Sequence, residues 1–496
     1  MTRHVLCLSR SYLANLLPAL GKRHPDTRYF HIVQTDAEAR SIAAQGGEVV
    51  LNLEAIVREG LSDSAPLWQE PADMRAVTGF SWSAIQSDRY LPHFDHATRL
   101  RIGGLLDKAV GDLFARQHFD AFVSEPVALF ITHLLFYYCR RNGTRPLLWG
   151  NTYFPDYFYF ADATNMSTPR REGELEAPET ERLRQTVEAY VGGVVGDKAG
   201  PAYHYAFSGV KNTRLGYFKQ RRGEMPLVLK PGLTSIGLQA ARLGRALLKR
   251  ALFPRGADFI TAGSVSEHAR YMRSLLTAPR IYDPLPETPS ADHVVYPLQY
   301  EPEASLLYYA PEIVSQTSFV ETILKALPPG KLLWVKEHPN QFGALGLKPW
   351  REIRKRHANL RFVHGRQSGR ELLKRAGLCV TISSTMGMDA LLIGRRVLVA
   401  GNVFFRHFPG AVALTSYAHL GEALNDPASY TPQDERAALT GHLIDFGLHA
   451  YRGDPQPSQI LFEPDNLDLL VAAIDNELAG GEAHSKPGAP HRDGGS

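Results

Sequence analysis

Val294-Val-Tyr-Pro-Leu298 is a short apolar run typical of a buried strand, and the alternation that decides the fold extends outward from it. A helical pattern follows from Ile313 to Leu327, and Lys331-Leu-Leu-Trp-Val335 is the next strand-like run. Short apolar runs that alternate with helix-length segments are typical of parallel sheets wrapped by helices. This stretch therefore predicts a doubly wound α/β domain.

The same alternation occurs on both sides of this stretch. The further predicted elements are strands at Val5–Leu8, Ala121–Val123, Pro146–Trp149, Arg361–Val363, Leu378–Ile382 and Arg396–Ala400, and helices at Tyr12–Leu20, Ala128–Arg140 and about Thr385–Ile393. Two such halves predict two Rossmann-like doubly wound domains that face each other across a cleft.

Four prolines crowd a polar stretch from Pro279 to Asp292, and we place the domain boundary there. We expect an N-terminal domain over residues 1–285, on the acceptor side of the cleft, with a basic helical insertion at about 205–255. A C-terminal, nucleotide-binding domain is expected over residues 286–479. Residues 480–496 are rich in Gly, Pro, His and Ser, and we expect them to be disordered.

The composition is that of an ordinary globular protein. The chain has 496 residues, of which 44% are hydrophobic and 21% are charged, so a largely disordered chain, a collagen-like repeat and a coiled coil are excluded. Its net charge of only +4 argues against a nucleic-acid-binding protein. Three scattered cysteines show no metal-ligand spacing and no disulfide framework, which indicates reduced thiols in a cytosolic protein.

No membrane span is evident in the sequence. The most apolar stretch, Ala121–Cys139, contains Glu125 and His133, which a lipid-facing helix would tolerate poorly. The apolar run at the N-terminus is too short for a secretory signal. We therefore expect the protein to be cytoplasmic.

One segment departs from the balanced charge. Residues 211–255 contain eleven basic residues and a single acidic one, Glu224, and Leu233 to Phe253 mixes apolar and basic residues at roughly helical spacing. Such a helix can lie on an anionic membrane surface, where each basic side chain contributes about 1 kcal/mol. The alternative is a helix packed on the domain with a solvated basic face. Contact with the inner face of the membrane through residues 211–255 is thus one of two readings.

Three clusters in the second half can carry chemistry. The first follows the strand at Val294–Leu298, where Glu301 and Glu303 stand two residues apart. In an extended segment such side chains share a face, and a carboxylate pair can divide protonation states for acid–base or nucleophilic work. The alternative is a polar loop in which Glu303 or Ser305 caps the next helix.

The second cluster, Lys336-Glu-His-Pro339, stands at the end of the strand Lys331–Val335. In doubly wound sheets ligands bind beyond the carboxyl ends of the strands. Lys336 and His338 can neutralise a phosphate there, and Pro339 stiffens the turn that aims the imidazole. The alternative is a structural histidine.

The third cluster is Thr381-Ile-Ser-Ser-Thr-Met-Gly387, where a strand runs through hydroxyl residues into a helix. The free N–H groups and the dipole of a helix start favour an anion, and Ser383, Ser384 and Thr385 add donors. The alternative is plain capping of the helix.

Together the clusters predict a nucleotide site that uses no metal and no other cofactor. The Asp-x-Asp spacing with which many glycosyltransferases hold a divalent ion on a pyrophosphate is absent from the sequence. A donor with one phosphate needs less neutralisation, and a Lys, a His and a helix start can stabilise its departing charge. This favours a CMP-activated sugar as donor substrate.

At these residues the sequence resembles the capsule polysaccharide biosynthesis glycosyltransferases, which include the Kdo transferases of capsule assembly. The matching runs are Gln299-Tyr-Glu-Pro-Glu-Ala-Ser305, Lys336-Glu-His-Pro339, Ser383-Ser-Thr-Met-Gly-Met-Asp-Ala-Leu391 and Gly401-Asn-Val-Phe-Phe405. The resemblance covers roughly residues 294–416. In the first domain only Val123-Ser-Glu-Pro126 is similar.

The resemblance implies a GT-B fold, a CMP-sugar donor (Kdo or another nonulosonic-type acid) and no metal. By this analogy His338 contacts the CMP phosphate, and the other donor-binding residues are Lys336, Pro339, Ser383, Ser384, Thr385, Gln299 and Glu301. Glu303 stands where related Kdo transferases carry a catalytic Asp. Because Pro302 stands where those relatives carry an acid, the role of Glu303 as nucleophile, base or anchor stays open. Glu125 is the candidate second carboxylate, from the opposite domain.

The resulting hypothesis is a metal-independent glycosyltransferase that is peripheral to the membrane and extends a surface or capsular polysaccharide or a glycolipid. One alternative is a CDP-polyol phosphotransferase of teichoic-acid-like polymer synthesis, although the Gln-x-Glu-Pro-Glu run before the His-Pro turn favours the capsule family. The other alternative is a non-catalytic GT-B scaffold at the membrane.

Overall fold

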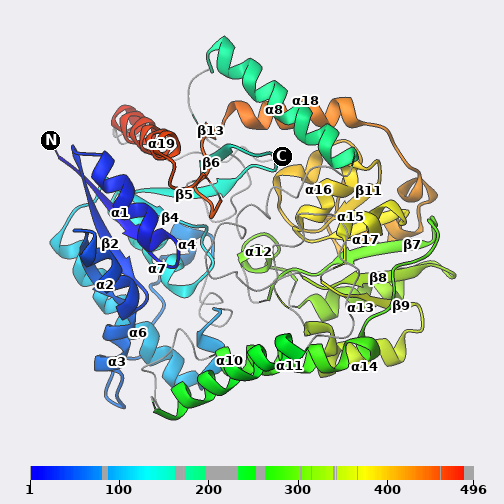
Figure 1. Ribbon diagram of the computed structural model, residues 1–496, viewed down its shortest axis with the longest axis horizontal. Helices are drawn as coiled ribbons and strands as arrows, with labels where there is room; N and C mark the ends of the chain where they lie inside the picture. Colours follow the sequence, from blue (N-terminus) through cyan, green and yellow to red (C-terminus); the bar gives the residue numbers. More distant parts are fainter. Residues whose placement is uncertain are drawn as a thin grey trace.

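The computed structural model describes residues 2–80, 88–161, 171, 175–196, 233–252, 263–301, 304–313, 315–338, 341, 343–365, 367–458 and 460–484. These residues form two α/β domains, drawn at the left and the right of Figure 1, and each domain is built on its own sheet. The expected fold class is thereby confirmed.

The N-terminal sheet has, in the described part of the chain, seven strands in the order β13-β6-β5-β4-β1-β2-β3. Strands β1 to β5 pair in parallel, whereas β6 runs antiparallel to both β5 and β13. The bounds are β1 Arg3–Leu8, β2 Thr27–Val33, β3 Glu48–Asn52, β4 Ala121–Ser124, β5 Arg145–Asn151, β6 Tyr157–Ala161 and β13 Tyr451–Arg452.

The C-terminal sheet is parallel throughout its described strands, in the order β12-β11-β10-β7-β8-β9. The bounds are β7 His293–Pro297, β8 Leu332–Lys336, β9 Leu360–Val363, β10 Leu378–Thr381, β11 Arg396–Val399 and β12 Ala411–Ala413. In both sheets the winding reverses beside the first strand, between β1 and β4 and between β7 and β10. Ligands of doubly wound proteins bind beyond the carboxyl ends of the strands at such switch points.

Helices cover both sheets (Figure 1), and many begin at a side-chain cap. Thr35 and Glu38 form a capping box at α2, and the Asp95 side chain caps α6. The helices are α1 Leu13–Arg23, α2 Asp36–Ala44, α3 Leu53–Gly60, α4 Met74–Thr78, α6 His96–Arg116, α7 Phe130–Arg141, α8 Ala177–Val195, α10 Leu233–Leu252, α11 Ser264–Ile281, α12 Ala304–Leu307, α13 Gln316–Ala326, α14 Lys348–Arg356, α15 Gly369–Lys374, α16 Thr385–Leu392, α17 Tyr417–Asn425, α18 Arg436–Leu448 and α19 Pro464–His484.

The predicted elements all occur, with ends displaced by a few residues. The sequence analysis missed β2, β3, β6, β12 and β13. Strand β2 carries His31 in its interior and β3 lies at the sheet edge with an exposed Glu48, so neither has the clean apolar run that marks a buried strand. The apolar stretch Ala121–Cys139 is β4 followed by α7, and both are packed in the core.

The C-terminal end of the chain returns to the N-terminal domain. Strand β13 pairs with β6, and α19, red in Figure 1, packs along α1. Leu470 and Ile474 of α19 share a buried cluster with Leu13 and Trp149. The structure thus differs from the expected C-terminal domain of 286–479, because burying the apolar face of α19 requires the distant first sheet.

The two ends of the expected domains also differ from the structure. Ile281 and Tyr282 are buried in the core of the C-terminal domain, so this domain begins before residue 286. Helix α19 continues to His484, so the expected disordered tail of 480–496 overlaps with a helix, and residues 485–496 lie outside the described chain.

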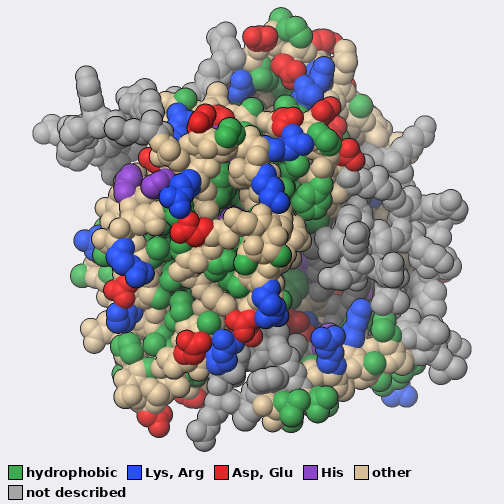
Figure 2. Space-filling view, turned by 60° about the vertical axis from the view of Figure 1, so that its left-hand side comes forward, with side chains coloured by type: hydrophobic (Ala, Val, Ile, Leu, Met, Phe, Trp, Pro, Cys, Tyr) green, Lys and Arg blue, Asp and Glu red, His purple; other side chains and the backbone are tan. Residues whose placement is uncertain are grey.

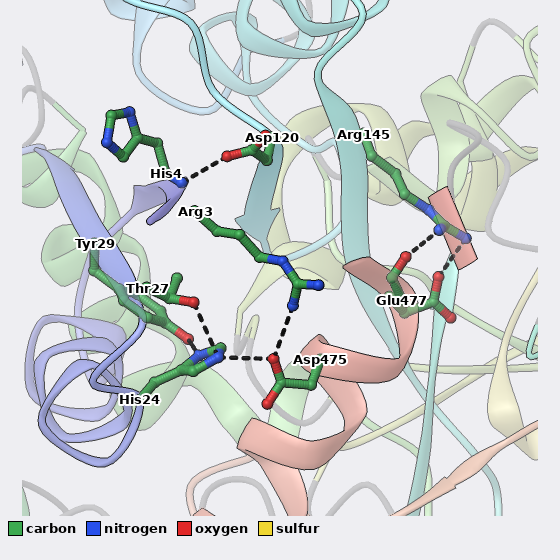
Figure 3. Close-up of polar contacts among 9 residues, drawn as sticks. All are labelled: Arg3, His4, His24, Thr27, Tyr29, Asp120, Arg145, Asp475 and Glu477. Carbon is green, nitrogen blue, oxygen red and sulfur yellow. Dashed lines mark hydrogen bonds and ion pairs between the residues drawn. The ribbon is translucent and has the colours of Figure 1, made fainter. Parts of the chain in front are cut away.

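Ion pairs hold α19 to the first sheet, as Figure 3 shows. The Asp475 carboxylate pairs with Arg3 at 3.2 Å and with the Nε2 atom of His24 at 2.8 Å. Glu477 is buried, pairs with Arg145 at 2.6 Å and accepts a hydrogen bond from the Tyr451 hydroxyl at 2.7 Å. These contacts tie the two ends of the chain together.

Glu477→Ala is expected to lower the free energy of unfolding by about 1–3 kcal/mol, because it removes the carboxylate partner of a partly buried guanidinium and one of the two acceptors of the Tyr451 hydroxyl. Asp468→Ala, on the same helix, removes an exposed pair with Arg23 and should cost at most about 0.5 kcal/mol. Urea titration of both variants measures the difference. Equal effects of the two substitutions would contradict the role of Glu477.

The surface agrees with a nearly neutral chain. On the face shown in Figure 2, basic and acidic side chains are interspersed. Each helix in the described part of the chain is too short or too polar to cross a bilayer.

Candidate functional site

At the switch point of the N-terminal sheet, Arg10 follows β1 and Glu125 follows β4, and the two side chains form an ion pair. Burial is the largest single effect and lowers the pKa of Arg10, but the Glu125 carboxylate, together with Tyr90 and Tyr12, leaves the pKa raised, so the guanidinium stays charged. Glu125 therefore lies at the expected edge of the first sheet, where it neutralises Arg10.

At the switch point of the C-terminal sheet, Gln299 follows β7 and Ser383 follows β10. The Ser383 hydroxyl donates a hydrogen bond of 3.2 Å to the Gln299 side-chain oxygen, and both residues are buried. Two of the sequence-predicted clusters are therefore in direct contact. The third flanks them, because β8, which leads to His338, is the other neighbour of β7.

Two glutamine side chains hold the loop of residues 299–301 by its main chain. The Gln316 side chain accepts from the Gln299 N–H at 2.6 Å and donates to the Gln299 carbonyl at 3.0 Å. Gln341 does the same for Glu301, with distances of 3.1 and 2.5 Å. The loop is therefore anchored to the start of α13 on one side and to the turn after β8 on the other.

Glu301 is held by the first turn of α13. Its carboxylate accepts a hydrogen bond from the Gln316 N–H at 3.3 Å. Burial raises the pKa of Glu301 above its ordinary value. Glu301 thus caps a helix from outside, which is a positioning role, and it lies in the loop predicted to hold the donor.

Lys336 and Glu337 both point into the protein. The Lys336 ammonium donates to the Gly365 carbonyl at 3.0 Å, and burial lowers the pKa of Lys336 to about 8. Glu337 accepts from the Tyr282 hydroxyl at 2.7 Å and from the Leu345 N–H at 3.3 Å, and burial raises its pKa to about 7. The two side chains shape the turn that presents the next residue, His338.

His338 is partly exposed, and its ring meets that of Tyr300 edge to face, with ring centres 5.9 Å apart. This contact places the imidazole beside the 299–301 loop. Its main-chain carbonyl accepts a hydrogen bond from the Gln341 N–H, so the same glutamine that holds Glu301 also closes the histidine turn.

Of the three hydroxyl residues at the start of α16, Ser384 caps the helix and Ser383 bonds to the neighbouring loop, which leaves Thr385. The Ser384 hydroxyl accepts from the Met386 N–H at 3.3 Å, and Ser383 is engaged with Gln299. Thr385 is the first residue of α16 and is partly exposed. A Cβ atom on Gly387 would come within 2.9 Å of the Phe405 ring, so glycine allows this helix to pack closely against the loop after β11. An anion near Thr385 would meet the positive end of the helix dipole.

A contact between Arg89 of the N-terminal domain and Tyr300 of the C-terminal domain lies between the two switch points. The guanidinium carbon of Arg89 lies 4.9 Å from the centre of the Tyr300 ring. Arg89 adjoins Tyr90, and Tyr90 lies close enough to Arg10 to affect its pKa, so this segment reaches the ion pair at the N-terminal switch point. The carboxyl ends of both sheets therefore border the same region.

The structure thus brings together Gln299, Glu301, His338 and Ser383, with Ser384 and Thr385 at the adjoining helix start. It turns Lys336 inward and keeps Glu125 on the opposite domain. Glu303 and Pro339 lie outside the described residues, as do residues 211–232 and 253–255 of the basic segment 211–255. The expectation of a metal-free site stays a prediction; within the described ranges, no group of three or more His, Cys, Asp or Glu side chains is placed to hold an ion.

Sequence reasoning missed Gln316, Gln341 and Arg89. A glutamine at the first position of a helix carries no periodic signal, and its bonding to a loop 17 residues earlier depends on the sheet order. Arg89 follows a stretch without a strand pattern, so nothing in its local sequence marks it.

Glu337→Gln is expected to remove a pH dependence of stability. Burial raises the pKa of this carboxyl from 4.5 to about 7, so the folded chain holds a proton that the unfolded chain releases. The free energy of unfolding should therefore fall by up to about 3 kcal/mol as pH rises through this range in the wild type. Urea titrations at pH 4.5 to 7.5 should show a flatter curve for the variant.

Glu352→Gln, at an exposed position of α14 in the same domain, should keep the wild-type slope. Parallel curves for the wild type and Glu337→Gln would show that Glu337 is not the group that takes up the proton.

The sequence of this region matches a known family. Residues 267–443 match the sequence model described as "Capsule polysaccharide biosynthesis protein". Protein FixF of Sinorhizobium fredii is 28% identical over 112 residues, which is 22% of this chain and 26% of FixF. The chain thus spans about a quarter of the length of this curated relative.

Two solved structures are similar at low identity. KpsC of Thermosulfurimonas dismutans, a β-Kdo 2,7-transferase, is 12% identical with a TM-score of 0.32, over 75% of this chain and 89% of that one. A glycosyltransferase of Rickettsia africae is 6% identical with a TM-score of 0.33, over 98% of this chain and 100% of that one. Neither likeness is strong enough to support an argument about activity.

The family match is therefore the informative finding, and it covers the loops of Gln299, His338 and Ser383. The match of residues 267–443 to the model described as "Capsule polysaccharide biosynthesis protein" confirms, over this part of the chain, the resemblance seen in the sequence.

Proposed function

We propose that this protein is a glycosyltransferase that transfers a sugar acid, Kdo or another nonulosonic-type acid, from a CMP donor to a surface or capsular polysaccharide or a glycolipid. The observation that carries the proposal is the contact of Ser383 with Gln299 at the switch point of the family-matched domain. This is the position at which doubly wound domains bind nucleotides.

Departure of CMP leaves an oxocarbenium-like centre on the sugar and a negative charge on the phosphate. His338, with a partly exposed ring beside Tyr300, is the group that would meet this charge, and the first turn of α16 adds N–H donors. Lys336 is buried, so its contribution would be long-range charge and the shape of the turn rather than a direct contact. Glu303 and Glu125 remain the candidate carboxylates for the sugar centre.

CMP is expected to raise the thermal unfolding midpoint of the protein, whereas UMP and UDP should not, because the site is proposed to read a cytosine nucleotide with one phosphate. Differential scanning fluorimetry at millimolar nucleotide measures this. In the same assay His338→Ala should lose most of the CMP response, and its turnover should fall on the order of 100-fold, the effect of one lost electrostatic contact of about 3 kcal/mol.

Product analysis separates the alternatives. Sugar transfer leaves no phosphate in the product, whereas a CDP-polyol phosphotransferase leaves a phosphodiester. A protein that shows neither a CMP response nor a product would be a scaffold, and the proposed function would be wrong.

We propose further that the protein binds the membrane surface through α10 and α11. Leu247, Leu248 and Leu252 of α10 are 50%, 60% and 64% exposed, and Arg242 and Arg245 on the same helix are exposed as well. Helix α10 packs on α11, and a hydrogen bond of 3.0 Å joins Gln239 to His268. The side of α10 that carries Gln239 is thus covered by α11, whereas the three leucines stay exposed. Exposed leucines beside arginines suit an anionic bilayer surface.

Leu247→Glu/Leu248→Glu is expected to weaken binding to vesicles that contain 30% phosphatidylglycerol by roughly tenfold or more, because two apolar anchors of about 1 kcal/mol each become acidic. Cosedimentation measures the bound fraction. Leu67→Glu, a change at a leucine that is 53% exposed outside this helix pair, is the control. Equal binding of all three proteins would exclude α10 as the contact.

A further inference from the structure

Arg89 is held rigidly from two sides. The buried Asp88 carboxylate accepts hydrogen bonds from the Tyr90 N–H at 2.6 Å and from the Phe130 N–H at 2.8 Å, which fixes the backbone beside Arg89 to the start of α7. At its other end, the guanidinium lies over the Tyr300 ring of the C-terminal domain. An arginine held in this way loses little conformational freedom when it binds a ligand.

The guanidinium of Arg89 has unused donors. Its Nε atom is buried and has no acceptor among the residues that the structure describes. The carboxylate of the preceding residue, Asp88, is engaged with main-chain N–H groups, and Glu125 at the N-terminal switch point pairs with Arg10. Stacking on a ring leaves the edge of the guanidinium open, and this edge is the part that binds a carboxylate through two parallel hydrogen bonds.

The place of Arg89 matches the chemistry of the proposed donor. In a CMP-activated sugar acid, the carboxylate and the phosphate oxygen are bonded to the same anomeric carbon, so the two anionic groups lie a few ångströms apart. Tyr300 contacts both the His338 ring and the Arg89 guanidinium. A phosphate at His338 would therefore leave the carboxylate within reach of Arg89.

We propose that Arg89 binds the carboxylate of the donor sugar and thereby makes the enzyme specific for an acidic sugar. The inference rests on the proposed function, and it adds a specificity-determining residue from the N-terminal domain. Arg89 touches the donor only when both domains border it, so the residue also makes donor binding depend on their contact.

The test compares Arg89→Gln and Arg89→Lys with Arg395→Gln. Arg395 also has a buried Nε atom without an acceptor in the described chain. It precedes β11, so it lies at the amino ends of the strands, opposite the carboxyl ends that border the candidate site. Two quantities are measured for each protein: the KM for CMP-Kdo, generated continuously from CTP and Kdo, and the Kd for CMP by calorimetry. Thermal unfolding confirms that each variant is folded.

Arg89→Gln is expected to raise the KM for CMP-Kdo by about 10- to 100-fold, the factor of one charge-assisted hydrogen-bonded pair, with the Kd for CMP within about twofold of wild type. Arg89→Lys should recover part of the loss, because it keeps the charge without the planar fork. Arg395→Gln should change neither quantity.

An unchanged KM in Arg89→Gln, or an equal loss in CMP binding, would overturn the role of Arg89 while the wild-type transfer activity upholds the proposed function. A wild-type protein that neither binds CMP nor transfers Kdo would overturn both.

Discussion

The hydrogen bond between Ser383 and Gln299 is the contact on which the candidate site depends, because it joins the loops after β10 and β7 across the switch point of the second sheet. A loop after a strand has no ladder to hold it, and this loop is held instead by the side chains of Gln316 and Gln341. Each amide satisfies both a main-chain N–H and a main-chain carbonyl, so the loop keeps one conformation without regular structure.

Buried side chains also hold the turn that carries His338. Lys336 and Glu337 precede it in sequence and are both ionisable, yet both are buried; Lys336 donates to the Gly365 carbonyl, and Glu337 accepts from the Tyr282 hydroxyl and the Leu345 N–H. Burial moves their pKa values toward neutrality from opposite sides, to about 8 and about 7. Only the third member of the turn is left to face the region between the domains, and the rigidity of the turn comes from its charged neighbours.

The two domains share one cluster of buried apolar side chains, which includes Leu134 of the first domain and Phe405 of the second, and aromatic and polar contacts add to it. Tyr308 bonds to His133 at 2.9 Å, Tyr153 stacks on Phe404 with ring centres 4.5 Å apart, and Arg89 lies over Tyr300. The chain also returns from the second domain to the first, where β13 pairs with β6 and α19 packs against α1. Such an interface constrains the relative position of the domains, and for a transferase it would couple the binding of donor and acceptor.

The sequence by itself determined the two doubly wound domains and the positions of the candidate loops. Apolar runs mark the strands, and the carboxyl ends of parallel strands share an edge, so Gln299, His338 and Ser383 could be assigned to one end of one sheet. The tertiary structure alone decided which side chains face that edge. Lys336 points inward and donates a hydrogen bond to the Gly365 carbonyl. Arg89 contacts Tyr300 of the other domain, and α19 packs against α1 rather than against the elements that precede it in sequence. In each case the deciding partner is distant in sequence, and local periodicity carries no information about such a partner.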